Sequence, residues 1–195
     1  MQLILKDIDL KTSWIKSGKE SFIYFETIDS TLNIALDQKY QESSVGKIVI
    51  TDNQTSGKGS YNKSWYSEAY KDLTFSIILG SSNNFQQNLI DETCSVIVSI
   101  LSEYQIEAYQ KQPNDIYVKD KKIAGILLSN VQIGNSGNYQ ALSVGININS
   151  NIELKELDIS SKANHTSFVK ELSKEINREK VLVEIIELLD KTIQK

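Results

Sequence analysis

The sequence predicts an α+β domain built on a mixed β-sheet, and three observations support this fold class. Segments rich in Ile, Val, Tyr and Phe, which favour strands, outnumber the segments with helical spacing. Few helical segments stand between strands as crossover connections, which an all-parallel sheet would require. No internal repeat or low-complexity linker divides the 195 residues, a length that one domain with its own core typically has.

The expected elements follow one another along the chain. Extended segments are expected at residues 2–5, 22–27, 46–52, 73–79, 106–110, 115–118, 122–131 and 139–147. Helices are expected at 31–41, 88–104 and in the tail from residue 167. In the tail, apolar side chains recur at helical spacing with charges between them: Val181, Leu182, Ile185, Ile186, Leu188, Leu189 and Ile193. The sequence Gly-Asn-Ser-Gly at 134–137 predicts a hairpin turn between the last two strands.

Composition excludes several classes of protein. A 40% hydrophobic and 24% charged chain is typical of soluble globular proteins, and its net charge of -4 argues against a nucleic-acid-binding surface. No apolar run is long enough to span a bilayer and the N-terminus lacks a signal-peptide pattern, so we expect a cytoplasmic protein without a membrane partner. The single cysteine, Cys94, predicts a buried free thiol. The single histidine, His165, leaves no metal-ligand cluster and no Ser-His-Asp set.

The segment QTSGKGSYNKSW, residues 54–65, predicts a long polar loop after a strand. Its two glycines would let backbone N–H groups approach an anion, and Lys58 and Lys63 add positive charge. It is not a P-loop, because Asp52 and Gly59 occupy the positions where that motif needs glycine and Ser or Thr. It is not a dinucleotide-binding fingerprint either, because Asn62 replaces the third glycine. By itself the stretch leaves an ordinary solvated loop as an equal alternative.

The segment KQPNDIYVKDKKIAG, residues 111–125, contains the only proline of the chain and predicts a turn between two strands. Asn114 and Asp115 suit a turn without any ligand. Asp115 could equally ligate Mg²⁺ through one carboxylate oxygen, with phosphates and waters completing the shell. Lys122 begins an apolar strand, where it could lie at the surface or reach into a cleft and neutralise a carboxylate and a phosphate together.

Five motifs in this order resemble the catalytic domain of the biotin protein ligases over residues 20–170: Asp-Ser-Thr at 29–31, QTSGKGSYNKSW, KQPND, KKIAG and GININ at 145–149. The resemblance implies a fold of the biotin/lipoate protein ligase type, a mixed β-sheet with helices packed on one face. It also implies a single catalytic domain over residues 1–195. We expect neither the N-terminal DNA-binding domain nor the small C-terminal β-barrel domain that some members carry.

The resemblance assigns roles to individual residues. Contacts with biotin are expected from Ser30, Thr31, Gln54, Gly57, Lys58, Gly59, Ser60, Trp65, Lys122, Gly125 and Ile126. Contacts with ATP or the adenylate are expected from Lys63, Asn114, Lys122 and Asn147. Asp115 is expected to bind Mg²⁺. Lys122, Asp115 and Lys58 are the expected catalytic residues. Helix capping by Ser30 and Thr31 and a core position for Trp65 remain alternatives.

The function that the resemblance implies is activation of biotin by ATP as biotinyl-5′-AMP, followed by transfer to a lysine of a biotin carboxyl carrier protein. This chemistry requires no protein nucleophile and depends on positioning and charge neutralisation. The expected partners are biotin, ATP, Mg²⁺ and the carrier, and the enzyme is expected to be a monomer or homodimer. Ser60 stands where many members carry arginine, so we expect weaker retention of the intermediate. A lipoate or octanoate ligase or transferase of the same fold, a non-catalytic biotin-binding protein and an interaction domain remain alternatives.

Overall fold

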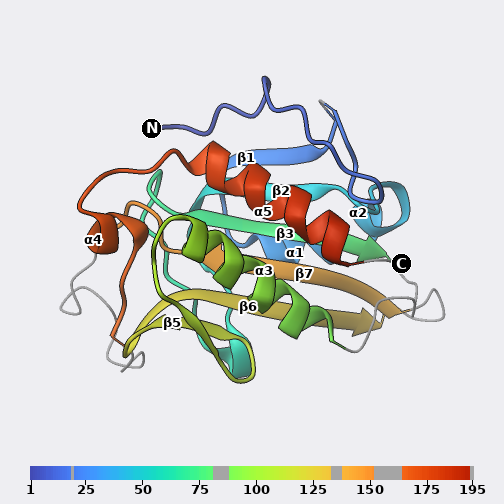
Figure 1. Ribbon diagram of the computed structural model, residues 1–195. Coiled ribbons are helices and arrows are strands. Elements are labelled where there is room, and N and C mark those ends of the chain that lie inside the picture. Colours follow the sequence, from blue (N-terminus) through green and yellow to red (C-terminus); the bar gives the residue numbers. More distant parts are fainter. Residues whose placement is uncertain (19, 81–87, 133–137, 152–163, 194–195) are drawn as a thin grey trace.

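The computed structural model describes residues 1–18, 20–80, 88–132, 138–151 and 164–193 (Figure 1). Within these residues the chain forms a seven-stranded sheet in the order β1-β2-β3-β7-β6-β5-β4. Strands β1 and β2 are parallel, and the other neighbouring pairs are antiparallel. The predicted mixed sheet is therefore confirmed. Its strands are β1 (Phe22–Ile28), β2 (Ile48–Gln54), β3 (Leu73–Gly80), β4 (Tyr109–Lys111), β5 (Asp115–Val118), β6 (Lys121–Gln132) and β7 (Asn138–Ile146).

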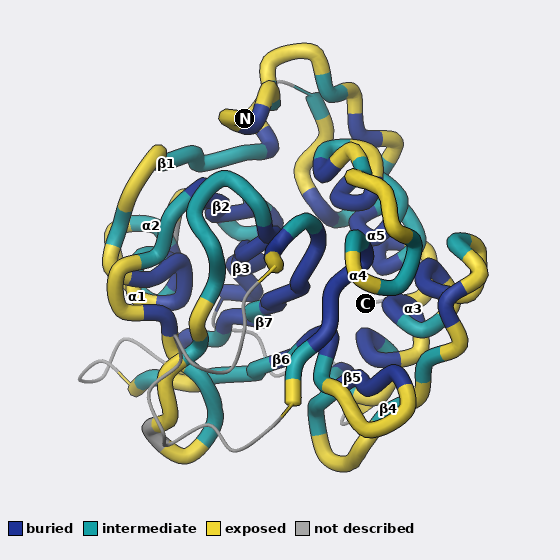
Figure 2. The backbone as a smooth tube through the Cα atoms, turned by 90° about the vertical axis from the view of Figure 1, so that its left-hand side faces the viewer, coloured by how far each residue is buried: buried dark blue, intermediate teal, exposed yellow. Residues whose placement is uncertain are grey.

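The two long helices, α3 (Leu89–Glu103) and α5 (Arg178–Thr192), pack side by side on one face of the sheet, as predicted (Figure 1). The short helices α1 (Thr31–Ala35) and α2 (Gln38–Ser43) lie against the opposite face (Figure 2). A further short helix, α4 (Phe168–Leu172), precedes α5. The sheet thus separates a large core beneath α3 and α5 from a smaller one beneath α1.

Alternation along the strands explains the two cores, because successive strand residues point to opposite faces of a sheet. Ile48 and Ile50 of β2 face the large core, while Val49 between them joins the small one. All eight residues of β3 are buried, as expected for a central strand covered on both faces, and its sequence LTFSIILG carries few polar residues. Figure 2 shows the central strands as the most buried part of the sheet.

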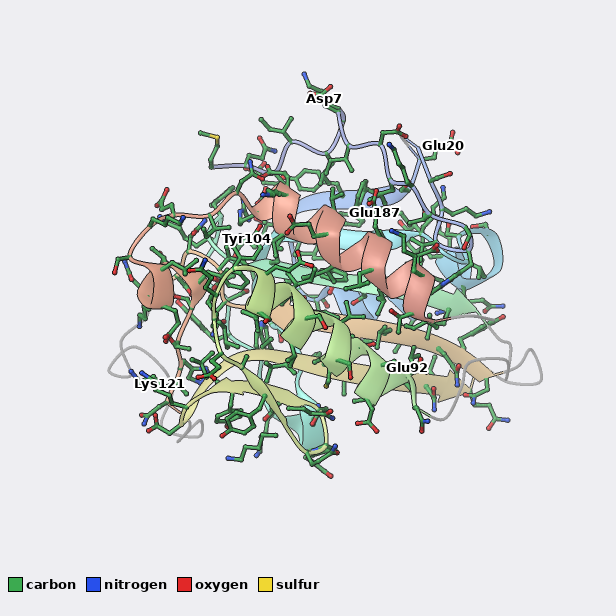
Figure 3. All side chains as sticks on the ribbon, viewed as in Figure 1. Asp7, Glu20, Glu92, Tyr104, Lys121 and Glu187 are labelled. Carbon is green, nitrogen blue, oxygen red and sulfur yellow. The ribbon has the colours of Figure 1, made fainter. Side chains whose placement is uncertain are left out.

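The N-terminal segment departs from the prediction, since no strand forms at residues 2–5. The backbone N–H of Leu3 donates to Oδ2 of Asp52 at 3.0 Å, so a side chain takes the place of a strand partner. Asp52 also forms a buried ion pair of 2.8 Å with Arg178, the only arginine of the chain. In Figure 3 the labels Asp7 and Glu20 mark this segment, which runs beside α5 before it reaches β1.

Side-chain caps explain the differences between the predicted and observed helices. The segment predicted as one helix at 31–41 divides, because Asp37 caps a second helix by accepting from the N–H of Lys39. The tail also divides. Helix α4 ends at Ser173 in a left-handed conformation, and Asn177 caps α5 through the N–H of Lys180 at 2.7 Å.

The remaining predictions concern short features. The strand expected at 106–110 is β4 at Tyr109–Lys111. The predicted turn at 134–137 lies outside the described residues, although the strands on either side are antiparallel, with Gln132 opposite Asn138. Cys94 is a buried free thiol, as predicted. None of the helices in the described ranges is both long enough and apolar enough to cross a bilayer.

Candidate active site

A cavity of about 530 Å³ opens on the face of the sheet that α1 covers. Its floor is formed by β3, β6 and β7, and its walls by α1, the polar loop, the start of β5 and the segment 164–170. All but one of the residues assigned from the sequence line this cavity. They are Ser30, Thr31, Gln54, Lys58, Gly59, Ser60, Lys63, Trp65, Asn114, Asp115, Lys122, Gly125, Ile126 and Asn147. Gly57 is the exception.

The polar loop folds back on itself as a tight turn. The N–H of Trp65 donates to the carbonyl of Gly57 at 2.9 Å, and the N–H of Gly59 donates to the carbonyl of Lys63 at 2.8 Å. A Cβ on Gly57 would lie 2.8 Å from Nε2 of Gln54 and closer still to the carbonyl oxygen of Trp65. Glycine is therefore required at residue 57 for close approach of two backbone segments, a structural role that the sequence interpretation missed.

Trp65 lies over two glycines that face each other across β6 and β7. Gly125 and Gly145 lie opposite each other in the register of β6 and β7. Because neither has a side chain, the indole of Trp65 occupies the space where their Cβ atoms would lie. A Cβ on Gly145 would lie 2.5 Å from Cζ2 and 2.6 Å from Nε1 of Trp65. The two glycines thus make room for the indole, and Trp65 forms a wall of the cavity as the resemblance implied.

Lys122 reaches into the cavity. Of the two positions that the sequence allowed, at the surface or in a cleft, the structure shows the second. Its ammonium lies 2.6 Å from Oδ1 of Asp115 and 5.3 Å from the ring centre of Trp65. The side chain of Lys122 is only 17% exposed. The neighbouring Lys121 is exposed and projects from the end of the sheet (Figure 3). Lys122 is therefore a cation held at a fixed point between an aromatic wall and a carboxylate.

Charge in the cavity is predominantly positive. Asp115 is its only acidic side chain within the described part of the chain, whereas Lys58, Lys63, Lys122 and Lys170 all line it. One carboxylate against four ammonium groups leaves an excess of positive charge, even though the whole chain carries -4. Such a site attracts a polyanion.

Two asparagines hold the walls together. Nδ2 of Asn114 donates to Oγ of Ser60 at 2.9 Å and also to the carbonyl of Ile126, so it joins the loop to β6. Nδ2 of Asn147 donates to the carbonyl of Thr166 at 2.9 Å. Both amides therefore have structural partners in addition to any role in ligand binding.

A chain of polar side chains lies at the α1 end of the cavity. Oε1 of Gln54 accepts from the backbone N–H of Thr31 at 2.8 Å and from its hydroxyl at 3.2 Å. Oγ of Ser76 donates to the hydroxyl of Thr31 at 2.9 Å and lies 2.7 Å from Oγ of Ser143. Ser30, which also lines the cavity, caps α1 through the N–H of Leu32 at 3.3 Å, as its alternative role predicted. A ligand entering this end meets hydroxyl and amide groups.

The segment 164–166 supplies residues that the sequence interpretation missed. The N–H of Lys122 donates to the carbonyl of Asn164 at 2.7 Å, and the N–H of Thr166 donates to the carbonyl of Lys122 at 2.9 Å. This pairing places His165 beside Lys122 and against the cavity. Burial, together with the charges of Lys122 and Lys170, lowers the pKa of His165, although Asp115 acts in the opposite direction. Nε2 of His165 is buried and has no hydrogen-bond partner among the residues that the structure describes.

Comparison with known proteins identifies the family. The model of the biotin/lipoate A/B protein ligase family matches residues 24–149, which include β2 to β7 and most of the cavity. This chain belongs to that family. Its fold, a mixed sheet whose two long helices pack on one face, is the one that the resemblance implied, and the short helices α1 and α2 on the opposite face add to that expectation.

Individual members of the family give the same result. The chain is 27% identical over 199 residues to the bifunctional ligase/repressor BirA of Bacillus subtilis, an alignment that covers 97% of this chain and 61% of that protein. It is 29% identical over 184 residues to human biotin–protein ligase, covering 89% of this chain and 25% of the human protein. It therefore spans about three fifths of its Bacillus relative. The fold matches that of the biotin protein ligase from Aquifex aeolicus in complex with biotin and ATP, with a TM-score of 0.71, 24% identity, and coverage of 89% of this chain and 70% of that one.

Proposed function

We propose that this chain is a biotin protein ligase catalytic domain, which activates biotin with ATP as biotinyl-5′-AMP and transfers the biotinyl group to a lysine of a biotin carboxyl carrier protein. The observation that carries this proposal is the position of Lys122. Its ammonium lies between the indole of Trp65 and the carboxylate of Asp115, in a cavity with excess positive charge. Membership of the family and the activities named for its relatives support the same function.

The polar α1 end of the cavity favours biotin over lipoate or octanoate. The ureido ring of biotin has N–H donors and a carbonyl acceptor, which suit the hydroxyls of Thr31 and Ser143 and the amide of Gln54. A dithiolane ring or an alkyl chain offers no such groups. It would bury the remaining hydrogen-bonding capacity of these side chains, at a cost of about 1–3 kcal/mol for each unsatisfied group.

Lys122 is suited to the first half-reaction, in which two anionic reactants must approach each other. A carboxylate oxygen of biotin attacks the α-phosphorus of ATP, and pyrophosphate leaves with the electrons of the broken P–O bond. The ammonium of Lys122 can neutralise the biotin carboxylate and the α-phosphate together, and Lys58 and Lys63 add positive charge at the loop. No residue of the protein has to form a covalent bond.

Asp115 fits a role in holding Mg²⁺. Its Oδ1 lies 2.6 Å from the Lys122 ammonium, at the cation end of the cavity, and Mg²⁺ is commonly held by one or two carboxylates together with substrate phosphates and water. Among the residues that the structure describes, no group of three or more His, Cys, Asp or Glu side chains is placed to hold a metal ion, so phosphates and waters would complete the shell. A bound ion would neutralise phosphate charge.

The second half-reaction needs access for an amine and protection from water. The uncharged amine of the acceptor lysine attacks the acyl carbon, AMP leaves with the electrons of the C–O bond, and the amine proton passes to solvent. The contacts Trp65 to Gly57 and Asn114 to Ser60 hold the loop over the cavity. A closed loop limits hydrolysis of the mixed anhydride.

Pyrophosphate release separates this function from its alternatives. We expect release with ATP, Mg²⁺ and biotin that exceeds release with lipoate or octanoate. Higher release with lipoate or octanoate would identify a ligase for those acids. Binding of biotin in calorimetry without any pyrophosphate release would indicate a non-catalytic biotin-binding protein.

A further inference from the structure

Tyr61 has a backbone conformation and an exposure that packing does not explain. Its φ of 55° and ψ of 42° place it in the left-handed region of backbone conformations. This conformation is unfavourable for a residue with a bulky side chain. The residue is 87% exposed, so it gains little from burial in return. Tyr66, after the loop's tryptophan, is 50% exposed. Both tyrosines border the cavity, which places them at its opening to solvent, and we call this pair the aromatic rim.

The loop holds the rim in place without help from the Tyr61 ring. The N–H of Gly59 donates to the carbonyl of Lys63 at 2.8 Å, and the N–H of Lys63 donates to the carbonyl of Ser60 at 3.1 Å. The side chain of Ser60 accepts from Asn114 at 2.9 Å. These contacts fix the turn from both sides, so the ring is presented on a rigid support. A strained and exposed residue on a rigid support is a candidate for binding.

Positive charge flanks the rim. Lys58 and Lys63 are exposed on the same loop, on either side of Tyr61 in the sequence. Tyrosine is enriched at the centres of protein interfaces because it offers a large, rigid contact area with a polar end. An aromatic group with ammonium groups on both sides favours a protein segment with acidic side chains.

We propose that the aromatic rim, Tyr61 and Tyr66, is the docking surface for the acceptor protein and contacts the acidic segment around its acceptor lysine. This inference rests on the proposed function. The acceptor amine must reach an acyl group held beside Lys122, so the segment that carries it has to cross the opening where the rim stands. A ligand enclosed in the cavity meets Trp65, whereas the ring of Tyr61 faces outward.

Two assays on Tyr61→Ala, Tyr66→Ala and a matched control test this proposal. The control is Tyr109→Ala, since Tyr109 is 49% exposed, lies on β4 and does not itself line the cavity. The first assay is pyrophosphate exchange with biotin and ATP alone. The second is the rate of labelling at varied concentrations of a purified biotin carboxyl carrier domain.

We expect the rim variants to raise the KM for the carrier domain at least tenfold, with wild-type exchange and wild-type stability in urea. Added salt should raise that KM in the wild type, because exposed charges are screened. Tyr109→Ala should behave as wild type in both assays. An unchanged carrier KM in the rim variants would overturn the proposal. A raised KM for ATP instead would assign the rings to the nucleotide, and a loss of stability would assign them to the fold. Absence of exchange in the wild type would contradict the proposed function itself, which the other outcomes leave standing.

Discussion

Gly145→Ala tests whether the floor of the cavity is built around the indole of Trp65. The new Cβ would lie 2.5 Å from Cζ2 and 2.6 Å from Nε1 of Trp65, where ordinary contacts are 3.4 Å or longer. The indole must therefore move by about 1 Å. Trp65 also donates its backbone N–H to the carbonyl of Gly57, and its ring lies near the ammonium of Lys122. A movement of Trp65 therefore disturbs both the polar loop and Lys122.

The expected cost is that of overpacking a closely packed site, about 1–3 kcal/mol of unfolding free energy. A double-mutant cycle isolates it, because the clash requires the indole. In a Trp65→Ala background, Gly145→Ala should cost close to nothing. Gly125→Ala serves as an internal comparison. Its Cβ would lie 3.0 Å from Trp65 and 3.2 Å from the flexible end of Lys122, so a smaller cost is expected.

Urea denaturation of the four proteins in the cycle measures the coupling, and calorimetric titration with biotin measures the effect on the site. We expect weaker biotin binding by Gly145→Ala together with the loss of stability. An equal cost of Gly145→Ala in both backgrounds would show that the strain arises somewhere other than the contact with the indole.

Three further predictions concern activity, retention of the intermediate and pH. Lys122→Ala should slow pyrophosphate release by about a hundredfold, the usual effect of removing one preorganised electrostatic donor, whereas the exposed neighbour Lys121→Ala should remain near wild type; an equal effect of both would remove Lys122 from the mechanism. Ser60→Ala removes one neutral hydrogen bond to Asn114, which is worth about 1 kcal/mol. Labelled biotinyl-5′-AMP should therefore leave the protein about fivefold faster. An unchanged release rate would show that this contact does not limit release. Burial and the charges of Lys122 and Lys170 lower the pKa of His165, so its contribution to stability is present above the unfolded value of 6.5 and is lost as the pH falls through the lower folded value. His165→Gln should abolish that loss, and nuclear magnetic resonance titration of the only histidine should give a midpoint below 6.5; a midpoint at or above 6.5 would contradict the assignment.

The pattern of apolar residues along the chain was sufficient to predict most strands of the sheet and the helix that packs on it. The apolar run of β3 and the strands on either side of 134–137 follow directly from residue type, and the helical spacing of the tail predicts most of α5. Residues 2–5 have the same apolar character but form no strand, because Leu3 pairs with the side chain of Asp52. Composition indicates which segments are apolar, but not which partner each one meets.

In the candidate site, too, the sequence predicts some features, whereas contacts that depend on tertiary packing cannot be predicted from it. Lys122 and Asp115 stand in one segment, so their shared location was predictable, although their direct contact was not. The resemblance included Gly145 in a motif without a role, because its contact with Trp65 exists only after β7 and the loop have packed. His165 comes beside Lys122 through backbone pairing between distant segments, and no local signal in the sequence indicates that pairing.

Mass spectrometry of the bound small molecule shows whether biotin is activated as its adenylate and whether this activation requires Lys122. The protein would be incubated with ATP, Mg²⁺ and equal amounts of biotin, lipoate and octanoate, separated from free ligands under native conditions, and its bound species weighed. We expect biotinyl-5′-AMP as the main species with the wild type and its loss with Lys122→Ala. Lipoyl- or octanoyl-AMP as the main species, or an equal amount of biotinyl-5′-AMP in both proteins, would contradict it.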